Sequence, residues 1–348
     1  MLNIYYGNET ADKAKFIYEN IKGKSLLIVP DQYSLQAEKD AFFYLGNKSF
    51  IDLIVVDFSS LGHKVVSEAC GREPAMIDKY GRHMLLAKII GEMEEDLKVF
   101  RGQGWKNSFI DMVNSLISEM KRYGVAPQAL KDKLEALDGN NYLKFKLEDI
   151  EKIYSVYQEQ IKDKYLDTED YIDFYGEKIA EASIVKEADV WIYGFDTFTP
   201  KNILIIQRLL KAARSVNVVM TYSSKAVDTQ DAALVVSEDN DLYELTYYVM
   251  QMLQKAAAEV GESVTMNEIH GDARRSVWQN KENITLAKTS SIYAEADRAA
   301  AYILSLVRDE GYRFGDIVVV CNDYELRGNL LRRTFTRWGI PVFMDKKR

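Results

Sequence analysis

Short apolar runs alternate with amphipathic stretches over the first part of this chain. Residues 2–6, 25–29 and 53–56 are compact hydrophobic runs, with the length and composition of buried β-strands. Between them, residues 15–21 and 34–43 place their apolar side chains at the three- and four-residue spacing of amphipathic helices. Strands that alternate with helices predict a parallel sheet with helices packed on its faces.

The hydrophobic pattern between residues 78 and 181 is almost entirely helical. Apolar residues recur there at i, i+3 and i+4, most clearly over residues 142–162. The stripe in that stretch consists of Leu143, Leu147, Ile150, Ile153, Tyr154, Tyr157 and Ile161. Because no strand is expected here, the pattern predicts a helical insertion at residues 71–185.

The alternating pattern resumes after the insertion. Residues 189–193 and 216–220 are predicted strands, and residues 200–211 form a helix between them, with Thr199 placed to cap it. A further helix is predicted at residues 242–259. These elements continue the α/β domain that the insertion interrupts.

The last part of the chain repeats the same alternation. Strands are expected at residues 283–288, 317–320 and 342–343, with helices at 292–310 and 324–338. The chain ends just after the third strand, so we expect a second α/β domain that is begun but not completed. The predicted divisions are residues 1–70 and 186–282 for the first α/β domain, 71–185 for the insertion and 283–348 for the second α/β domain.

Composition and charge narrow the functional classes. The 348 residues are 47% hydrophobic and 28% charged. Since no apolar run approaches the ~20 residues of a membrane-spanning helix, we expect a cytoplasmic protein with no membrane partner. The formal net charge of -8 argues against a protein that coats DNA by electrostatics alone.

Metal and thiol chemistry have little support in the sequence. Cys70 and Cys321 lie far apart and the three histidines are scattered, so we predict no metal site and no His-based catalytic site. The acidic run at residues 167–170 is expected to cap a helix rather than to hold a metal.

The sequence GNETADKA, which follows the first predicted strand and precedes a helix, has the layout of a phosphate-binding loop. A working Walker A loop has a glycine before its lysine, for the tight turn, and a serine or threonine after it, for Mg²⁺. Asp12 and Ala14 stand at these two places. Gly7 and Lys13 remain candidates for binding a nucleotide through a degenerate loop. The alternative is an ordinary turn, in which Thr10 caps the helix and Lys13 is solvated.

Four segments of the chain resemble one protein family. An α/β domain interrupted by helices and followed by a second α/β domain is the layout of superfamily 1 helicases. Residues 30–38 (PDQYSLQAE), 165–171 (YLDTEDY), 194–200 (GFDTFTP) and 339–348 (GIPVFMDKKR) closely resemble segments of the B subunit of bacterial AddAB helicase-nucleases, in the same order. The resemblance implies a helicase-like, RecA-like parallel α/β domain with a helical insertion, followed by the start of a second α/β domain.

The resemblance also implies a role and partners. B subunits of this family form a heterodimer with a motor and nuclease A subunit, which unwinds and resects duplex DNA ends for recombinational repair. Their helicase-like half is implied to handle single-stranded DNA and to recognise a recombination hotspot sequence. The nuclease domain and iron-sulfur cluster of the family are expected beyond residue 348, so no residue is assigned to either.

The groups that a working motor of this superfamily needs are missing from the matching positions. The strand end that should carry an Asp-Glu pair for Mg²⁺ and the attacking water has Tyr193 and Gly194. Cys321 stands where active relatives have a phosphate-contacting arginine. Together with Asp12 and Ala14, these residues predict that the chain does not hydrolyse ATP, while they leave open whether ATP and Mg²⁺ still bind.

Two places are candidates for DNA contact. Gln32 and Tyr33 lie in the loop through which motor relatives contact single-stranded DNA, and Tyr33 could stack on a base. The alternative is that Tyr33 packs beneath the following helix. Arg333 and Arg337 are four residues apart on one predicted helix and share a face that could follow a phosphate backbone, or could simply be solvated.

Two other functions stay open at this point. The chain could be a slow genuine DNA-dependent ATPase or translocase, which would require Mg-ATP binding through Lys13. It could also be a protein-interaction module in which the insertion docks the motor subunit without contact to DNA.

Overall fold

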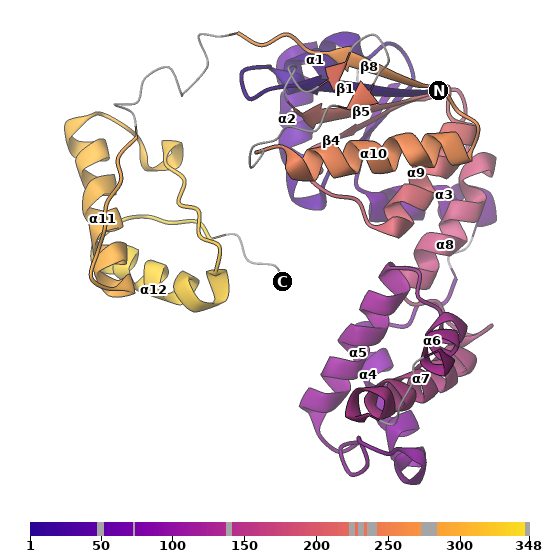
Figure 1. The fold of residues 1–348 in the computed structure, drawn as a ribbon. Helices are drawn as coiled ribbons and strands as arrows, with labels where there is room; N and C mark the ends of the chain where they lie inside the picture. The colour runs from indigo at the N-terminus through magenta and orange to yellow at the C-terminus, as the bar shows by residue number, and fades with distance from the viewer. Residues whose placement is uncertain are drawn as a thin grey trace. The chain divides into compact units, whose positions relative to one another are not determined.

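The computed structural model describes residues 1–46, 52–71, 74–136, 141–222, 227–228, 233–234, 242–272 and 284–344 (Figure 1). The chain divides into two compact units, Met1–Ser276 and Val277–Arg348. The predicted boundary between residues 282 and 283 and the segment 345–348 lie outside the described residues.

The first unit is built on a six-stranded sheet. The strands follow the spatial order β3-β2-β4-β5-β1-β8, and every neighbouring pair is parallel. Their bounds are Leu2–Gly7 for β1, Ser25–Ile28 for β2, Leu53–Val56 for β3, Asp189–Tyr193 for β4, Ser215–Thr221 for β5 and Val264–Glu268 for β8. The predicted parallel α/β architecture is confirmed, and the sheet is consistent with a RecA-like fold.

The edge strand β8 was not predicted from the sequence. Val264 and Met266 pack against the hydrophobic core, while Thr265 faces the other side and donates a hydrogen bond to Asn3 of β1. Two apolar residues are too few to distinguish a short edge strand from a loop. A separate antiparallel pair is formed by β6 (Val227–Asp228) and β7 (Ala233–Leu234).

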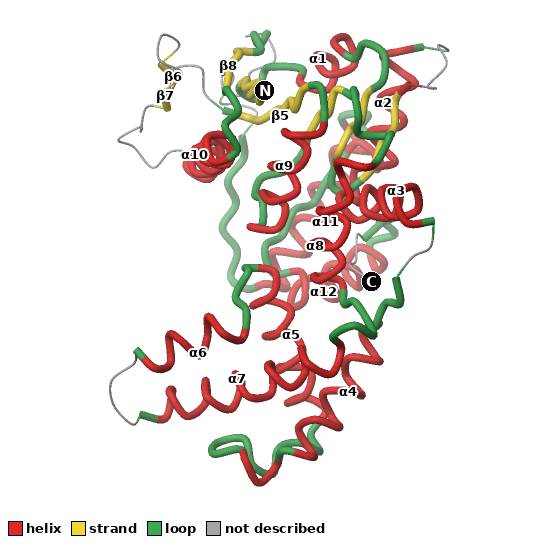
Figure 2. The backbone as a smooth tube through the Cα atoms, turned by 90° about the vertical axis from the view of Figure 1, so that its right-hand side faces the viewer, coloured by secondary structure: helices red, strands yellow, loops and turns green. Residues whose placement is uncertain are grey.

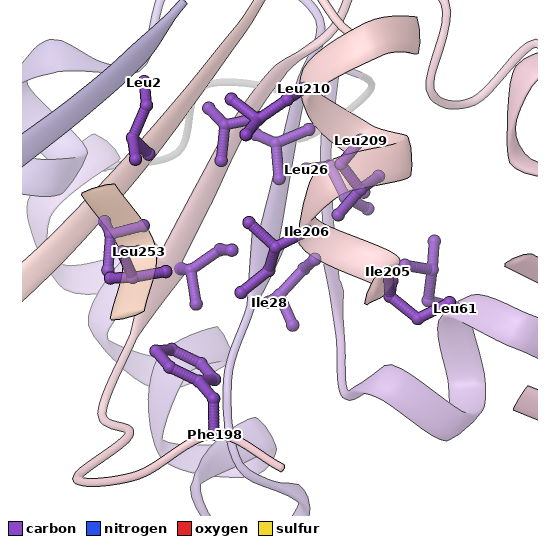
Figure 3. Close-up of a cluster of buried hydrophobic side chains, with 14 of the residues drawn as sticks. Leu2, Leu26, Ile28, Leu61, Phe198, Ile205, Ile206, Leu209, Leu210 and Leu253 are labelled. Carbon is purple, nitrogen blue, oxygen red and sulfur yellow. The ribbon is translucent and has the colours of Figure 1, made fainter. Parts of the chain in front are cut away.

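One face of the sheet carries the largest hydrophobic cluster. The helices that contribute to it are α3 (Phe58–Cys70), α8 (Thr168–Lys178), α9 (Pro200–Ala212) and α10 (Glu244–Glu259). Leu26 and Ile28 of β2 meet Ile206 of α9 in this cluster, and Leu253 of α10 joins it (Figure 3). The helix α9 begins as predicted, because the Thr199 side chain accepts a hydrogen bond from the backbone N–H of Asn202.

The other face of the sheet carries a second, more aromatic cluster under α1 (Lys13–Asn20) and α2 (Ser34–Leu45). Trp191 of β4 stacks on Tyr5 of β1, with ring centroids 5.6 Å apart, and Phe16 of α1 packs edge-on against Trp191. Helices therefore cover both faces of the sheet.

The predicted helical insertion is present between β3 and β4. After α3, it contains α4 (Lys79–Glu92), α5 (Asn107–Arg122), α6 (Pro127–Glu135) and α7 (Tyr142–Ile161). The helix α8 also lies within the predicted insertion at residues 71–185, but it packs into the core of the sheet instead. Helices α4, α5 and α7 enclose a hydrophobic cluster of their own, and α6 runs beside α7 (Figure 2). The insertion therefore has its own core, separate from the two faces of the sheet.

The second unit has a small core between two helices. Ala300 and Ile303 of α11 (Ile292–Asp309) pack with Phe335 of α12 (Tyr324–Arg337). The helices were predicted, but the described parts of the three predicted strands are not strands. A strand needs a neighbour for its backbone hydrogen bonds, and Val318 and Val320 are 82% and 84% exposed.

Candidate functional site

Three of the predicted sites lie at one edge of the sheet. Because all six strands are parallel, their carboxyl ends share that edge, as in other open α/β sheets that bind ligands there. The loop that starts at Gly7 follows β1, the 3-10 helix Asp31–Tyr33 follows β2, and Tyr193 and Gly194 end β4. The strand β5 separates β1 from β4 in the sheet.

The loop between β1 and α1 is closed by hydrogen bonds within itself. The side-chain oxygen of Asn8 accepts from both the backbone N–H and the hydroxyl of Thr10, at 3.0 and 2.7 Å. The backbone N–H of Ala11 donates to the carbonyl of Asn8. Gly7 has no space for a side chain, since a Cβ would lie 2.7 Å from both the Ala11 Cβ and the Ile269 carbonyl. These contacts keep the loop compact.

Lys13 turns into this loop rather than out of it. Its side chain is 9% exposed, and its ammonium donates to the carbonyl of Asn8 at 2.7 Å and, at 3.4 Å, to that of Ala11. Burial lowers the pKa of Lys13 below its ordinary value, although Glu9 and Asp12 act in the opposite direction. The ammonium that was predicted to meet a phosphate therefore donates to the loop's own carbonyls.

The start of α1 differs from the ordinary turn considered as an alternative. Asp12, not Thr10, caps α1, because its side chain accepts from the backbone N–H of Lys15 at 3.0 Å. Lys13 is buried rather than solvated. Asp12 thus has a structural role at the position where a working Walker A loop has glycine.

A segment that follows β8 crosses beside the same loop. The backbone N–H of Ile269 donates to Tyr6 at 2.7 Å, and that of Asp272 donates to Thr10 at 3.3 Å. Gly271 packs so closely that a Cβ there would lie 1.9 Å from the Thr10 hydroxyl oxygen. We call residues 269–272 the strap; it attaches the edge strand to the loop between β1 and α1.

Gln32 and Tyr33 occupy different environments after β2. Gln32 is exposed, so its amide is available to a ligand. Tyr33 is half-buried: its hydroxyl donates to Asp40 of α2 at 2.9 Å, and its ring packs edge-on against Tyr193 at 5.8 Å. Burial and this hydrogen bond raise the pKa of Tyr33. Part of the ring is therefore committed to packing beneath α2.

The end of β4 carries no acidic pair. Tyr193 is half-buried in the aromatic cluster, and Gly194 has a φ of +83°, a conformation that favours glycine. The next carboxylate in the sequence, Asp196, is exposed. The residues described at this strand end thus offer no pair of carboxylates for Mg²⁺ and water.

The two candidate arginines belong to the second unit. Arg337 of α12 pairs with Asp297 of α11, and Trp338 donates its indole N–H to the same carboxylate at 2.9 Å. The hydrogen bonds from Trp338 and Arg337 hold the pKa of Asp297 below its ordinary value. Arg333 is exposed. Arg337 has a structural partner, while the charge of Arg333 faces solvent.

A buried ionic cluster joins the insertion to α8 and was not predicted. The Lys121 ammonium of α5 lies 2.6 Å from Asp167 and 2.7 Å from Asp170. Burial disfavours ionisation of Asp167, but the Lys121 cation, together with the backbone hydrogen bond from Asp170 and the charge of Arg82, outweighs it and lowers the pKa of this carboxyl. Asp167 also caps α8, as predicted for the acidic run, by accepting from the backbone N–H groups of Glu169 and Asp170. Lys121 lies far from Asp167 in sequence, so no local pattern signals the pair.

Two features are absent from the part of the chain that the structure describes. No helix in the described ranges is long and apolar enough to span a membrane. Within the same ranges, no group of His, Cys, Asp or Glu side chains is arranged to hold a metal ion.

Comparison with known proteins gives one consistent family. The chain matches the family described as "ADDB, N-terminal" over residues 4–285. It is 28% identical to the B subunit of the ATP-dependent helicase/deoxyribonuclease of Clostridium tetani, over 99% of this chain and 32% of that protein. The same-named protein of Clostridium kluyveri is 30% identical, over 100% of this chain and 32% of its own length. The chain therefore spans about a third of the length of the curated relatives it matches.

Proposed function

Since this chain belongs to the AddB N-terminal family, we propose that it is the non-motor, helicase-like scaffold of an ATP-dependent helicase/deoxyribonuclease. In this role it guides single-stranded DNA from duplex ends, while a partner A subunit supplies the motor. The names of the relatives support membership of such a machine, because each is the B subunit of an ATP-dependent helicase/deoxyribonuclease.

The single observation that carries the non-motor assignment is the position of Lys13. Its ammonium is buried and donates to carbonyls of the loop that should hold the phosphates. A nucleotide would have to displace these hydrogen bonds and would find Ala14 in place of the Mg²⁺ ligand. Phosphoryl transfer depends on positioned cations, so this geometry favours an inactive site.

The chain is expected to show no saturable binding of a fluorescent ATP analogue with Mg²⁺ and no ATP turnover. Fluorescence titration and a steady-state phosphate-release assay test this, each with the wild-type chain and the Lys13→Ala variant. Turnover that persists in Lys13→Ala comes from contamination. Turnover that Lys13→Ala abolishes would instead establish the slow ATPase and refute the proposal.

The DNA-handling part of the proposal rests on the exposed face after β2. Gln32 is exposed at the carboxyl edge of the sheet, where its amide can reach a base or a phosphate. The partly exposed ring of Tyr33 lies next to it. Arg333, whose charge faces solvent in the second unit, is a further candidate for a phosphate contact.

We expect this chain to bind a fluorescent single-stranded oligonucleotide at low salt and to lose affinity as salt rises, because phosphate contacts release counterions. Gln32→Ala should weaken binding by about 3- to 10-fold, the loss expected for one hydrogen-bonding side chain. Fluorescence anisotropy across a salt series measures both effects.

The matched control for this titration is Gln128→Ala. Gln128 is also an exposed glutamine, but it lies on α6 in the insertion, where it donates to Asp132. Its replacement should leave DNA affinity unchanged. If the wild-type chain binds no oligonucleotide even at low salt, the interaction-module alternative becomes the better account.

A further inference from the structure

The outer edge of β8 has backbone groups that no strand in the described residues pairs with. Ser263 accepts from the Leu2 N–H and Ile269 donates to the Tyr6 carbonyl, so the odd-numbered residues here direct their backbone groups towards β1. In a parallel ladder, alternate residues of a strand direct their backbone N–H and C=O groups to opposite sides, so the even-numbered residues of β8 direct theirs away from β1. The outward-facing backbone groups therefore belong to Val264, Met266 and Glu268.

A cavity of about 450 Å³ lies at the carboxyl end of this edge. Lys15, Phe16 and Glu19 of α1 line one side of it, and Glu268 and the strap line the other. Phe16 and Ile269 provide the apolar part of the lining. A strand added to β8 would thus run past a cavity large enough for long side chains.

The charge of the cavity selects the occupant. Its lining contains more acidic than basic side chains. The acidic ones are Asp12, Glu19, Glu268 and Asp272, and the basic ones are Lys15 and His270. An anionic ligand such as nucleic acid is disfavoured there. A lysine or arginine side chain fits, because it has an apolar stem for Phe16 and Ile269 and a cationic tip for the carboxylates.

We propose that the outer edge of β8 and the adjoining cavity bind an extended, lysine- or arginine-containing peptide segment of a protein partner as an added strand. The backbone of Val264, Met266 and Glu268 holds the segment, and the cavity selects its basic side chains. Addition of a strand to an open sheet edge is a common mode of peptide recognition. The site is distinct from the DNA-handling face after β2 and does not depend on it.

The test uses two fluorescein-labelled peptides, one with alternating threonine and lysine and one with alternating threonine and glutamate. At physiological ionic strength, the wild-type chain should bind the lysine peptide at least about tenfold more tightly than the glutamate peptide. Met266→Pro should weaken the lysine peptide by about tenfold, because proline removes an outward N–H without removing a bond to β1.

Two charge reversals separate the cavity from general attraction to an acidic protein. Glu268→Lys should weaken the lysine peptide by about tenfold. Glu310→Lys, which makes the same charge change at an exposed position of the other unit, should leave the affinity unchanged. Circular dichroism confirms that each variant is folded. Equal binding of the two peptides, no binding of the lysine peptide, or wild-type affinity in folded Met266→Pro and Glu268→Lys would overturn the proposal.

Discussion

Replacement of Lys121 by methionine is expected to lower the free energy of unfolding by about 3–5 kcal/mol, the cost of removing one partner from a buried ion pair. Lys121 is 5% exposed, and its ammonium contacts both Asp167 and Asp170. Without it, the buried carboxylate of Asp167 and the half-buried carboxylate of Asp170 repel each other and lose their counter-ion. Urea unfolding, followed by circular dichroism, measures the effect.

The Lys121→Met effect should depend on pH in a defined direction. In the wild type the pKa of Asp167 is lowered, so its stabilising contribution is present above the ordinary value of 3.8 and is lost as pH falls through the folded value. In Lys121→Met, burial without a cation raises the pKa of this carboxyl, so acid neutralises the unpaired charge. The stability difference between wild type and variant should therefore narrow as pH falls from neutral.

Lys88→Met is the matched control for Lys121→Met. Lys88 also belongs to a helix of the insertion, but its pair with Glu92 spans 3.8 Å and both side chains are largely exposed. Such a pair contributes at most about 0.5 kcal/mol. If the two substitutions lowered the free energy of unfolding equally, this would contradict the conclusion that the buried cluster holds α5 and α8 together.

Asp149→Ala is expected to destabilise the insertion by about 3 kcal/mol, because it leaves several backbone donors without a partner. Asp149 of α7 is fully buried. Its carboxylate accepts from the backbone N–H groups of Lys98, Val99 and Phe100 at 2.9, 2.8 and 3.0 Å. These bonds attach the loop after α4 to α7.

Native-state hydrogen exchange gives the sharpest test of Asp149→Ala. The amides of residues 98–100 should lose protection in the variant, while those of β1 keep theirs. Asp149→Asn should have a smaller effect, since its amide keeps one acceptor oxygen. Asp78→Ala, which removes a single exposed helix cap on α4, should cost about 1 kcal/mol. A similarly small loss of unfolding free energy in Asp149→Ala would show that water replaces the carboxylate as the acceptor of these hydrogen bonds.

Elements with a regular apolar pattern, either a short continuous run or a helical stripe, were predictable from the sequence. The strand β4, the helix α9 with its Thr199 cap and the long helices of the insertion all appear where the pattern places them. Residues 317–320 show the limit of this reasoning. Their apolar composition is that of a strand, but strand formation also needs a partner, which the described residues do not supply.

For the candidate site, the sequence by itself determined which groups are present and which are missing. Asp12, Ala14, Tyr193 and Gly194 stand at the positions where the resemblance to superfamily 1 helicases predicts the motor's required groups. The alternation of strands and helices also predicted a parallel sheet, in which the loop after β1 and the segment after β2 lie at the same edge, because parallel strands place their carboxyl ends together.

Only the tertiary structure decided how the charged side chains are used. Lys13 turns inward to the carbonyl of Asn8, the strap after β8 packs against Thr10, and Lys121 reaches Asp167 across 46 residues of sequence. Local patterns do not contain this information. The energy of a charge depends on its burial and on the distance to its partners, and both are set by segments that are remote in the sequence.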